Sequence, residues 1–474
     1  MTNFQAPPGA GRPAAPSGPP PGYRPPPGYG PGGYGPSPGG PPPPYGVPAQ
    51  RTAVFAGGPV GPPPGGFGAP PPDASAPAPR RRGLVVTATV AVVALIAAGI
   101  GAYFWISRST GGAESPTAAV QLLAADLSAK RYLDAVGRLQ PGEADLFRDA
   151  GEVVVTELER LQVLRPETDL GALSGQIDVR DLRFSETPRM VRDNVAITEL
   201  VGGVVTISAD PSTIPFTDSF AKLAFPDGPP PAGQPTEIDI AQVVAQQGEP
   251  LRVASVEVDG GWYVSLFYTV ADYALASENL AWPTTSIAPR GAATPNDALR
   301  ETVNALLDGN IQRLVELAPP GELSVLHDVG PVLVAQAGAQ PIGGQLVELE
   351  TTQTDVRGDT ALAISRVVVQ VPDGRRLTVT RTGECIDLQG SDGSAQRLCT
   401  QDVLKQADLG VTDPALKRVL PRLVQAMLDI KIVTTEIDGA YYVSPGRTLV
   451  GIYADLLGTL QPEDLADLLS SSVR

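Results

Sequence analysis

The chain has 474 residues, and its net charge of −16 is distributed unevenly. Residues 1–82 carry six arginines against one aspartate, a balance of +5, so residues 83–474 carry −21. This acidic part excludes nucleic-acid binding, because it repels phosphate backbones, and it favours cationic partners. One histidine and two cysteines are too few for a centre of converging His and Cys ligands, so we expect no metal and no cofactor.

Residues 1–82 are predicted to form a disordered, Pro/Gly/Tyr-rich cytoplasmic tail. They contain 27 of the 51 prolines and repeated Pro-Gly-Tyr units. With so little apolar surface to offset chain entropy, the segment is expected to have polyproline-II character. Residues 42–45, Pro-Pro-Pro-Tyr, leave two interpretations open: docking to a cytoplasmic partner, or a solvated spacer.

Residues 83–106 are predicted to be a transmembrane helix. They carry no charge, and at about 1.5 Å per residue such a helix is about 36 Å long, enough to cross a bilayer core. Three arginines, at 80–82, precede it, so the positive-inside rule places the tail in the cytoplasm and the rest outside the plasma membrane. The segment is too long and too far from Met1 for a cleaved signal peptide, which predicts a single-pass signal anchor followed by a linker at 107–114.

The remaining chain contains an internal repeat at a constant offset of 179 residues. We therefore predict two copies of one domain, at 115–276 and 294–456, joined by a linker at 277–293. The matching segments are Ser115-Pro116 with Thr294-Pro295, Pro141-Gly142-Glu143 with Pro320-Gly321-Glu322, Asp149 with Asp328, and Val258-Asp259-Gly260 with Ile437-Asp438-Gly439.

Each copy is expected to open with helices. A hydroxyl residue followed by proline marks helix starts at Pro116 and Pro295. Further helical segments lie on either side of the Pro-Gly-Glu turn, and then the apolar period changes to two. The predicted strands are 177–184, 194–200 and 204–208 in the first copy, and 346–351, 361–371 and 376–381 in the second, with hairpin turns at Gly202-Gly203 and Asp373-Gly374.

Each copy is expected to close with a helix, at 238–247 or 415–428, and then a hairpin. The hairpin turns, Asp259-Gly260 and Asp438-Gly439, suit a type I′ turn. Helices followed by a curved antiparallel sheet indicate an α+β fold. Residues 457–474 are predicted to be an amphipathic helix docked on the second copy.

The helical opening, the sheet and the closing hairpin with its aromatic-Tyr-Val-Ser sequence resemble the nuclear-transport-factor-2-like (cystatin-like) superfamily. The tail and the single span before the repeats resemble actinobacterial membrane-anchored proteins with exported domains of that kind, including Mce-associated proteins. The resemblance covers residues 115–456 and implies a cone-shaped cavity in each copy. The superfamily includes isomerases, dehydratases and non-enzymatic binding modules, so the fold does not assign an activity.

Four aromatic residues of the closing hairpins are ligand-pocket candidates: Trp262, Tyr263, Tyr441 and Tyr442. Side chains alternate across a strand, so one ring of each pair is expected to face the concave side of the sheet. Two interpretations stay open: the rings form core, or the inward rings line a cavity for an apolar ligand.

Repeated acids are the other candidates for chemistry. Glu143 and Glu322 follow Pro-Gly at expected helix starts, so either a favourable interaction with the helix dipole or a role as buried general acid or base explains them. Asp149 and Asp328 also occur in both copies. His327 is expected to be a polar residue on a helix surface, with proton transfer as the alternative.

Cys385 and Cys399 are predicted to form a disulfide, because both lie in the part expected outside the membrane and no other cysteine competes. The segment between them, 386–398, is expected to be a mobile loop. Its Gly390–Ser394 stretch is read as a hairpin tip, because it lacks the ligand pattern of a calcium loop.

These features favour a membrane-anchored, extracytoplasmic binding or assembly (scaffold) protein of the bacterial cell envelope that is not an enzyme. The expected partners are the bilayer, an apolar ligand or envelope protein, and a cytoplasmic partner for the tail. Two alternatives are an enzyme of the ketosteroid-isomerase/dehydratase type and a FliL-like accessory of a membrane machine. The lining of each cavity distinguishes them: acids with Tyr or Asn partners indicate an enzyme, an apolar lining a lipid binder, and a filled cavity a scaffold.

Overall fold

The computed structural model describes residues 111–168, 175–338, 341–406 and 413–472. All of them fall in one structural unit, Ala78–Arg474. The predicted tail at 1–82, the predicted span at 83–106 and the first half of the 107–114 linker lie outside the described residues. Within the described ranges, no helix has both the length and the apolar character that crossing a bilayer requires.

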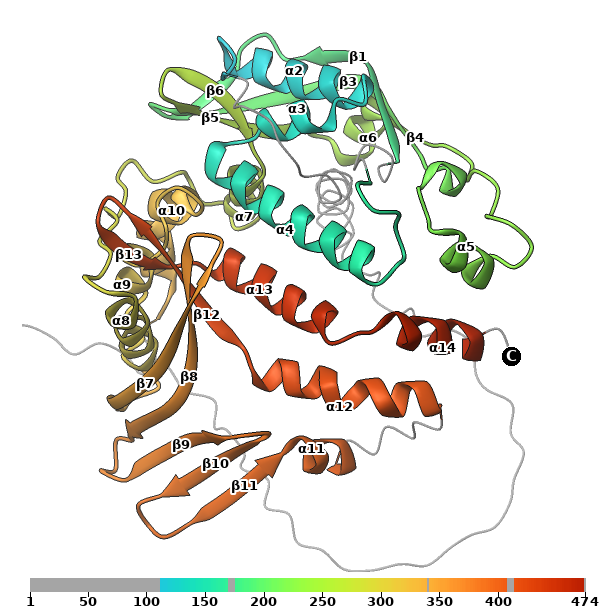
Figure 1. The fold of residues 1–474 in the computed structure, drawn as a ribbon. Helices are drawn as coiled ribbons and strands as arrows, with labels where there is room; N and C mark the ends of the chain where they lie inside the picture. The colour runs from blue at the N-terminus through green and yellow to red at the C-terminus, as the bar shows by residue number, and fades with distance from the viewer. Residues whose placement is uncertain (1–110, 169–174, 339–340, 407–412, 473–474) are drawn as a thin grey trace, which may run out of the picture. The chain divides into compact units, whose positions relative to one another are not determined.

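The first predicted copy contains a six-stranded antiparallel sheet with three helices ahead of it in the chain (Figure 1). The helices are α2 (Pro116–Ser128), α3 (Tyr132–Gly137) and α4 (Pro141–Arg160). The strand order is β1-β3-β5-β6, and β2 and β4 also pair with β3. The remaining elements are β1 (Gln176–Phe184), β2 (Arg189–Arg192), β3 (Val195–Ser208), η2 (Pro211–Thr213), α5 (Asp218–Ala224), β4 (Thr236–Asp239), α6 (Ile240–Gln247), β5 (Leu251–Val258), β6 (Gly261–Ser265) and α7 (Leu266–Ser277).

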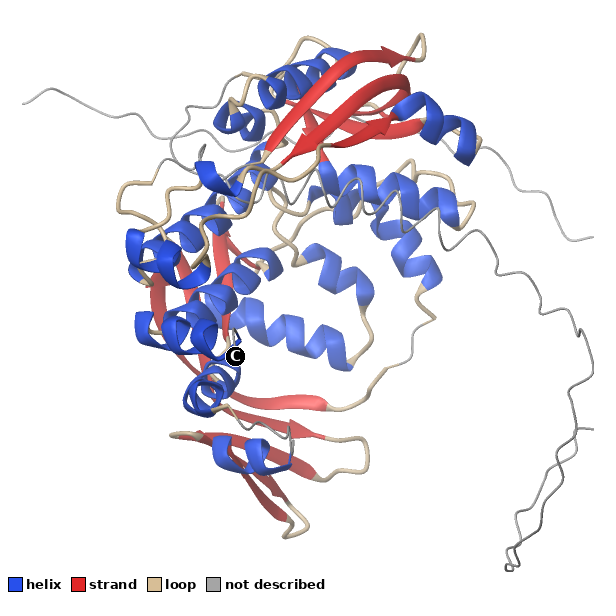
Figure 2. Ribbon diagram, turned by 90° about the vertical axis from the view of Figure 1, so that its right-hand side faces the viewer, coloured by secondary structure: helices blue, strands red, loops and turns tan. Residues whose placement is uncertain are grey.

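The second copy contains a separate, seven-stranded antiparallel sheet, drawn in red with the first sheet in Figure 2. Its strand order is β11-β10-β9-β8-β12-β13, and β7 also pairs with β8. Its elements are α8 (Pro295–Leu307), α9 (Ile311–Glu316), α10 (Ser324–Gln336), β7 (Gln345–Val356), β8 (Asp359–Gln370), β9 (Arg376–Thr382), β10 (Cys385–Gly390), β11 (Ala395–Cys399), α11 (Thr400–Gln406), α12 (Pro414–Leu428), β12 (Lys431–Ile437), β13 (Ala440–Val443), α13 (Pro445–Gly458) and α14 (Pro462–Ser472). The α+β fold with curved antiparallel sheets is confirmed.

The local signals at helix starts and hairpins are confirmed. Ser115 Oγ accepts a hydrogen bond from the N–H of Ala118 at 3.2 Å, and Thr294 caps α8 in the same way. Both central residues of the two closing turns have positive φ, 52° and 78° at Asp259 and Gly260 and 52° and 77° at Asp438 and Gly439. These angles are those of a type I′ turn, which matches the twist of the paired strands.

The Gly202-Gly203 prediction is wrong. The two glycines lie inside β3, which runs unbroken from Val195 to Ser208, while Asp373-Gly374 does turn between β8 and β9. Gly203 has φ +130°, and the register of β1 shifts beside Gly202. The glycines therefore bend a continuous strand, because pairing with β1 continues on both sides of them.

The bend in β3 splits the first sheet into two branches. β5 pairs with β3 up to Leu200, and β4 pairs with it from Val204 onward. Helix α6 fills the space between these branches: Ile240 is 2% exposed and packs with Leu200 and Leu251. The interior of the first copy is therefore filled by apolar side chains.

The second sheet splits in the same way at a β-bulge in β8. β12 pairs with β8 as far as Ala363, and β9 pairs with it from Arg366 onward. Opposite them, β7 pairs with Ile364 and Arg366 but leaves Ser365 unpaired. A bulge bends its strand, so β9, β10 and β11 form a separate arm, visible at the bottom of Figure 1.

The C-terminal helix α14 contacts more than the second copy. Arg418 and Arg422 of α12 pair with Asp467 and Asp464 of α14. Leu465 of α14 also packs against an apolar cluster around Leu164 in the first copy. The predicted docking on the second copy is therefore only part of the contact.

Candidate functional site

The repeated glutamates Glu143 and Glu322 are buried, with 1% and 6% of their surface exposed. Glu143 accepts hydrogen bonds from the hydroxyl of Ser265 and, at 2.8 Å, from the N–H of Leu266 at the start of α7. Glu322 accepts equivalent bonds from Ser444, at 2.6 Å, and Gly446, at 3.0 Å, at the start of α13. Glu143 lies in the first turn of α4, as the dipole interaction requires, whereas Glu322 precedes α10. Each carboxylate also binds the N-terminus of the helix that follows the closing hairpin.

Burial sets the protonation of both carboxyls. It raises the pKa of Glu143 to about 7, against the opposing effect of the bonds from Ser265, Leu266 and Phe267. Burial also raises the pKa of Glu322, and there the charge of Arg447 opposes the shift as well. Both carboxyls fasten a helix to a hairpin within their own copy.

Asp149 and Asp328 each reach from one copy to the other. Asp149 forms an ion pair with Arg447 of α13, and Asp328 accepts a hydrogen bond from the hydroxyl of Tyr268 in α7 at 2.6 Å. Tyr268 and Arg447 are themselves 179 residues apart, so the two contacts are reciprocal. The repeated acids therefore belong to an interface in which equivalent surfaces of the two copies face each other.

The Pro-Gly-Glu turns also meet at this interface. The side chain of Gln140 donates to the carbonyl oxygen of Gly321 at 2.9 Å. A Cβ on Gly142 would lie 1.9 Å from that oxygen, so only glycine permits this approach.

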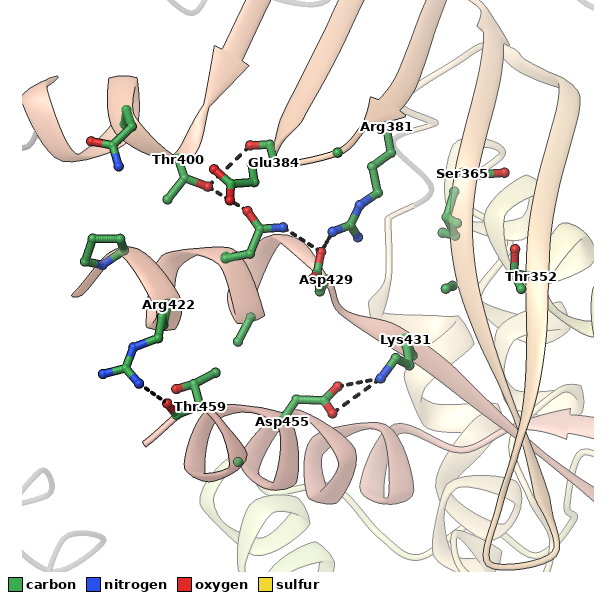
Figure 3. Close-up of a pocket in the computed structure, with 18 of the residues that line it drawn as sticks. Thr352, Ser365, Arg381, Glu384, Thr400, Arg422, Asp429, Lys431, Asp455 and Thr459 are labelled. Atoms are coloured by element: carbon green, nitrogen blue, oxygen red, sulfur yellow. Dashed lines mark hydrogen bonds and ion pairs between the residues drawn. The ribbon is translucent and has the colours of Figure 1, made fainter. Parts of the chain in front are cut away.

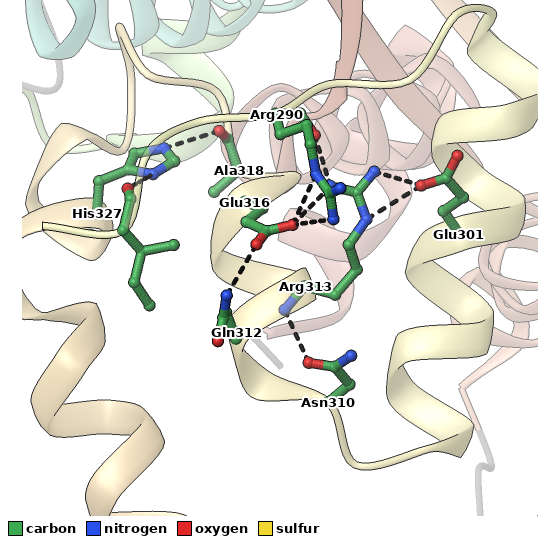
Figure 4. A network of polar contacts seen from close by, with 9 residues as sticks. Arg290, Glu301, Asn310, Gln312, Arg313, Glu316, Ala318 and His327 are labelled. Atoms are coloured by element: carbon green, nitrogen blue, oxygen red, sulfur yellow. Dashed lines mark hydrogen bonds and ion pairs between the residues drawn. The ribbon is translucent and has the colours of Figure 1, made fainter. Parts of the chain in front are cut away.

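The predicted surface position of His327 is wrong: the residue is buried, with 5% of its surface exposed. Its two ring nitrogens lie 3.0 Å from the carbonyl oxygens of Ile287 and Ala318 (Figure 4). Beside it, Arg290 and Arg313 bind the carboxylate of Glu316. The imidazole therefore holds the linker against the second copy, and both of its nitrogens face backbone atoms.

The four aromatic candidates pack into protein. Tyr263 and Tyr442 are 9% and 6% exposed. Trp262 packs against the helical core of the first copy, and Tyr441 packs on Ala298 and Leu317 of the second.

A pocket of about 840 Å³ lies in the second copy, between the arm and helices α12 and α13 (Figure 3). Thr352, Ala363 and Ser365 contribute from β7 and β8. The other lining residues are Ile364, Arg381, Gly383, Glu384, Thr400, Gln401, Pro421, Arg422, Gln425, Ala426, Asp429, Lys431, Asp455, Gly458, Thr459 and Gln461. None of the aromatic candidates is among them. Ser365, at the bulge in β8, is a lining residue, and no motif in the sequence indicated the pocket.

Charged and amide groups hold the pocket walls together. Lys431 Nζ lies 3.1 Å from Asp455 Oδ2, joining β12 to α13, and Arg381 of the arm pairs with Asp429. The Thr400 hydroxyl donates to Gln425 Oε1 at 2.7 Å and so links the arm to α12. The lining therefore carries charges of both signs.

The predicted disulfide is confirmed: Cys385 and Cys399 are bonded, with Cα atoms 4.0 Å apart. The expected mobile loop between them is instead the β10–β11 hairpin, in which the two cysteines are direct cross-strand partners. The hairpin tip at Gly390–Ser394 is where the sequence placed it. The neighbours of the cysteines, Glu384 and Thr400, line the pocket, so the disulfide fixes the spacing of two lining residues.

No family model and no curated protein matches the chain. A solved structure, the budding yeast Cdc5 polo-box domain in complex with an Spc72 phosphopeptide, is 10% identical over 74% of this chain and 97% of that one. Its TM-score is 0.10, which carries no argument about fold. In the part of the chain that the structure describes, no group of three or more His, Cys, Asp or Glu residues is placed to hold a metal ion.

Replacing both cysteines with serine is expected to lower the free energy of unfolding by about 2 kcal/mol. The crosslink restricts the unfolded chain, but the hairpin lies at a sheet edge and can open locally, which limits the global loss. Urea unfolding of the full-length protein measures this. Reduction of the native protein should reproduce the loss and leave the double variant unchanged; two free thiols in the unfolded, unreduced protein would contradict the pairing.

Proposed function

We propose that the chain is a single-pass, membrane-anchored binding and assembly protein of the bacterial cell envelope. Its second copy carries the binding site, and its first copy supports that site. The observation that carries the proposal is the contrast between the copies: α6 fills the split in the first sheet, whereas the split in the second sheet adjoins a pocket of about 840 Å³.

The pocket has properties of a binding site. Its volume lies in the range of pockets for small ligands, and residues of four strands, β7, β8, β9 and β12, and three helices, α11, α12 and α13, converge on it. Asp429 and Asp455 are each paired with a cation, which favours recognition over general acid–base chemistry. The charged side chains of its lining favour a hydrophilic ligand over the apolar ligand expected from the aromatic residues.

The first copy suits a supporting role. Its interior is closed by apolar packing, and the reciprocal contacts of Asp149 and Asp328 join it to the second copy. In this proposal, the span at 83–106 anchors the copies, and the filled copy holds the binding copy at a fixed position outside the membrane.

Single cysteines test both the location and the site in intact cells. Gln461 lines the pocket, whereas Gln246 is exposed on α6 of the filled copy. We expect a membrane-impermeant, photoactivatable maleimide to label Gln461→Cys and Gln246→Cys and to spare Ser17→Cys in the tail. After illumination, Gln461→Cys alone should yield a defined adduct.

The controls separate the two parts of the proposal. Labelling of Ser17→Cys alone would reverse the orientation. Adducts of equal yield and identity from Gln246→Cys and Gln461→Cys would show that the pocket is not the binding site.

A further inference from the structure

We infer that the pocket binds a zwitterionic peptide, a short hydrophilic ligand with a free ammonium and a free carboxylate group. This inference rests on the proposed function of the second copy. Its basis is the charge of the lining, which holds three cations and three acids: Arg381, Arg422, Lys431, Glu384, Asp429 and Asp455.

Two of the cations are available to a ligand. The side chains of Lys431 and Asp455 are 38% and 36% exposed, and those of Arg381 and Asp429 are 26% and 37% exposed. Water screens such pairs, so exchanging one partner for a ligand group costs little. Arg422 differs, because it is committed to the buried carboxylate of Asp464 and to the carbonyl oxygen of Thr459.

Glu384 supplies a site for an ammonium group. It is exposed at the end of the arm, beside the disulfide, and its carboxylate forms no ion pair within the described residues. Its backbone carbonyl accepts a hydrogen bond from the N–H of Thr400 at 3.2 Å, which fixes its place on the arm.

A ligand with charge of one sign fits this lining less well. An anion that binds Lys431 displaces Asp455 and leaves that carboxylate next to the charge of the anion. A cation alone binds Glu384 and makes no use of Lys431 or Arg381, whereas a ligand with both groups pairs with Glu384 and with one of these cations. A lipid tail is disfavoured, because it would lie among the six charged side chains of the lining and displace water from them.

Tri-alanine is a suitable probe, because its only charges are at its termini. Ligand-observed NMR on the full-length protein in detergent micelles compares the affinity of tri-alanine with those of N-acetyl-tri-alanine and tri-alanine amide. We expect N-acetylation to weaken binding at least tenfold and amidation at least fivefold. In Glu384→Gln, N-acetylation should no longer weaken binding. In Lys431→Met, amidation should no longer weaken binding.

Lys417→Met is the matched control, since Lys417 is exposed on α12 outside the pocket. It should leave all three affinities unchanged. Equal binding of the free and blocked peptides overturns the inference, as does tighter binding of glycerophosphoethanolamine, which would indicate a lipid headgroup. If the Gln461→Cys adduct forms but tri-alanine does not bind, the ligand class is wrong and the proposed function stands; if neither is seen, both fail.

Discussion

Replacing Gly142 with alanine is expected to lower the free energy of unfolding by about 3 kcal/mol or more. This is the upper end of the destabilisation that overpacking usually causes. The added Cβ would lie 1.9 Å from the oxygen and 2.3 Å from the carbonyl carbon of Gly321. These are backbone atoms, which cannot rotate away as a flexible side chain would. Relief requires the two Pro-Gly-Glu turns to separate, and with them the hydrogen bond from Gln140 to Gly321.

Gly321→Ala is the matched control. Gly321 is equivalent to Gly142 by the 179-residue offset, but a Cβ there meets nothing within 4 Å. Neither glycine has a positive φ, so backbone strain does not separate them. Because alanine favours a helix over glycine by about 1 kcal/mol, Gly142→Ala would stabilise the protein if the turns did not touch. Urea unfolding shows whether Gly142→Ala stabilises or destabilises the protein. Equal changes in unfolding free energy for Gly142→Ala and Gly321→Ala would contradict the contact between the two turns.

Local sequence signals predicted the elements that depend on a few neighbouring residues. The caps at Ser115 and Thr294 and the Asp-Gly turns needed only a side chain and the conformational freedom of one or two positions. The turn predicted at Gly202-Gly203 was wrong because a glycine with positive φ occurs in β-bulges as well as in turns. Only the pairing with β1 shows which of the two forms, and β1 is too distant in the sequence to leave a local signal.

The candidate site was predictable only in part. The disulfide followed from the cysteine count and the expected location outside the membrane, and the repeat offset identified Asp149 and Asp328 as related acids. The same offset relates Tyr268 to Arg447, the residues that these two acids contact. The sequence did not predict the buried position of His327, because its partners are backbone carbonyl oxygens, which all residue types have in common.

The buried carboxyl of Glu143 should make the folded protein less stable as the pH rises from 4.5 to 7. Burial raises the pKa of the folded carboxyl to about 7, from an ordinary value of 4.5. Between these values the folded chain keeps a proton that the unfolded chain has released. Stability from this group is therefore complete below pH 4.5 and is lost as pH rises through 7, by about 3 kcal/mol in all.

Glu143→Gln isolates this contribution, because the amide keeps the shape of the carboxyl and stays neutral. We expect the difference in unfolding free energy between variant and native protein to move by about 3 kcal/mol in favour of the variant between pH 4.5 and 7.5. Urea unfolding across this range measures it, and comparing the two proteins cancels every other titrating group. Glu322→Gln should show a slope of the same sign, because burial raises that pKa too, with Arg447 opposing it. A flat difference for Glu143→Gln would mean that the bonds from Ser265 and Leu266 outweigh burial and that the carboxylate is charged in the folded protein.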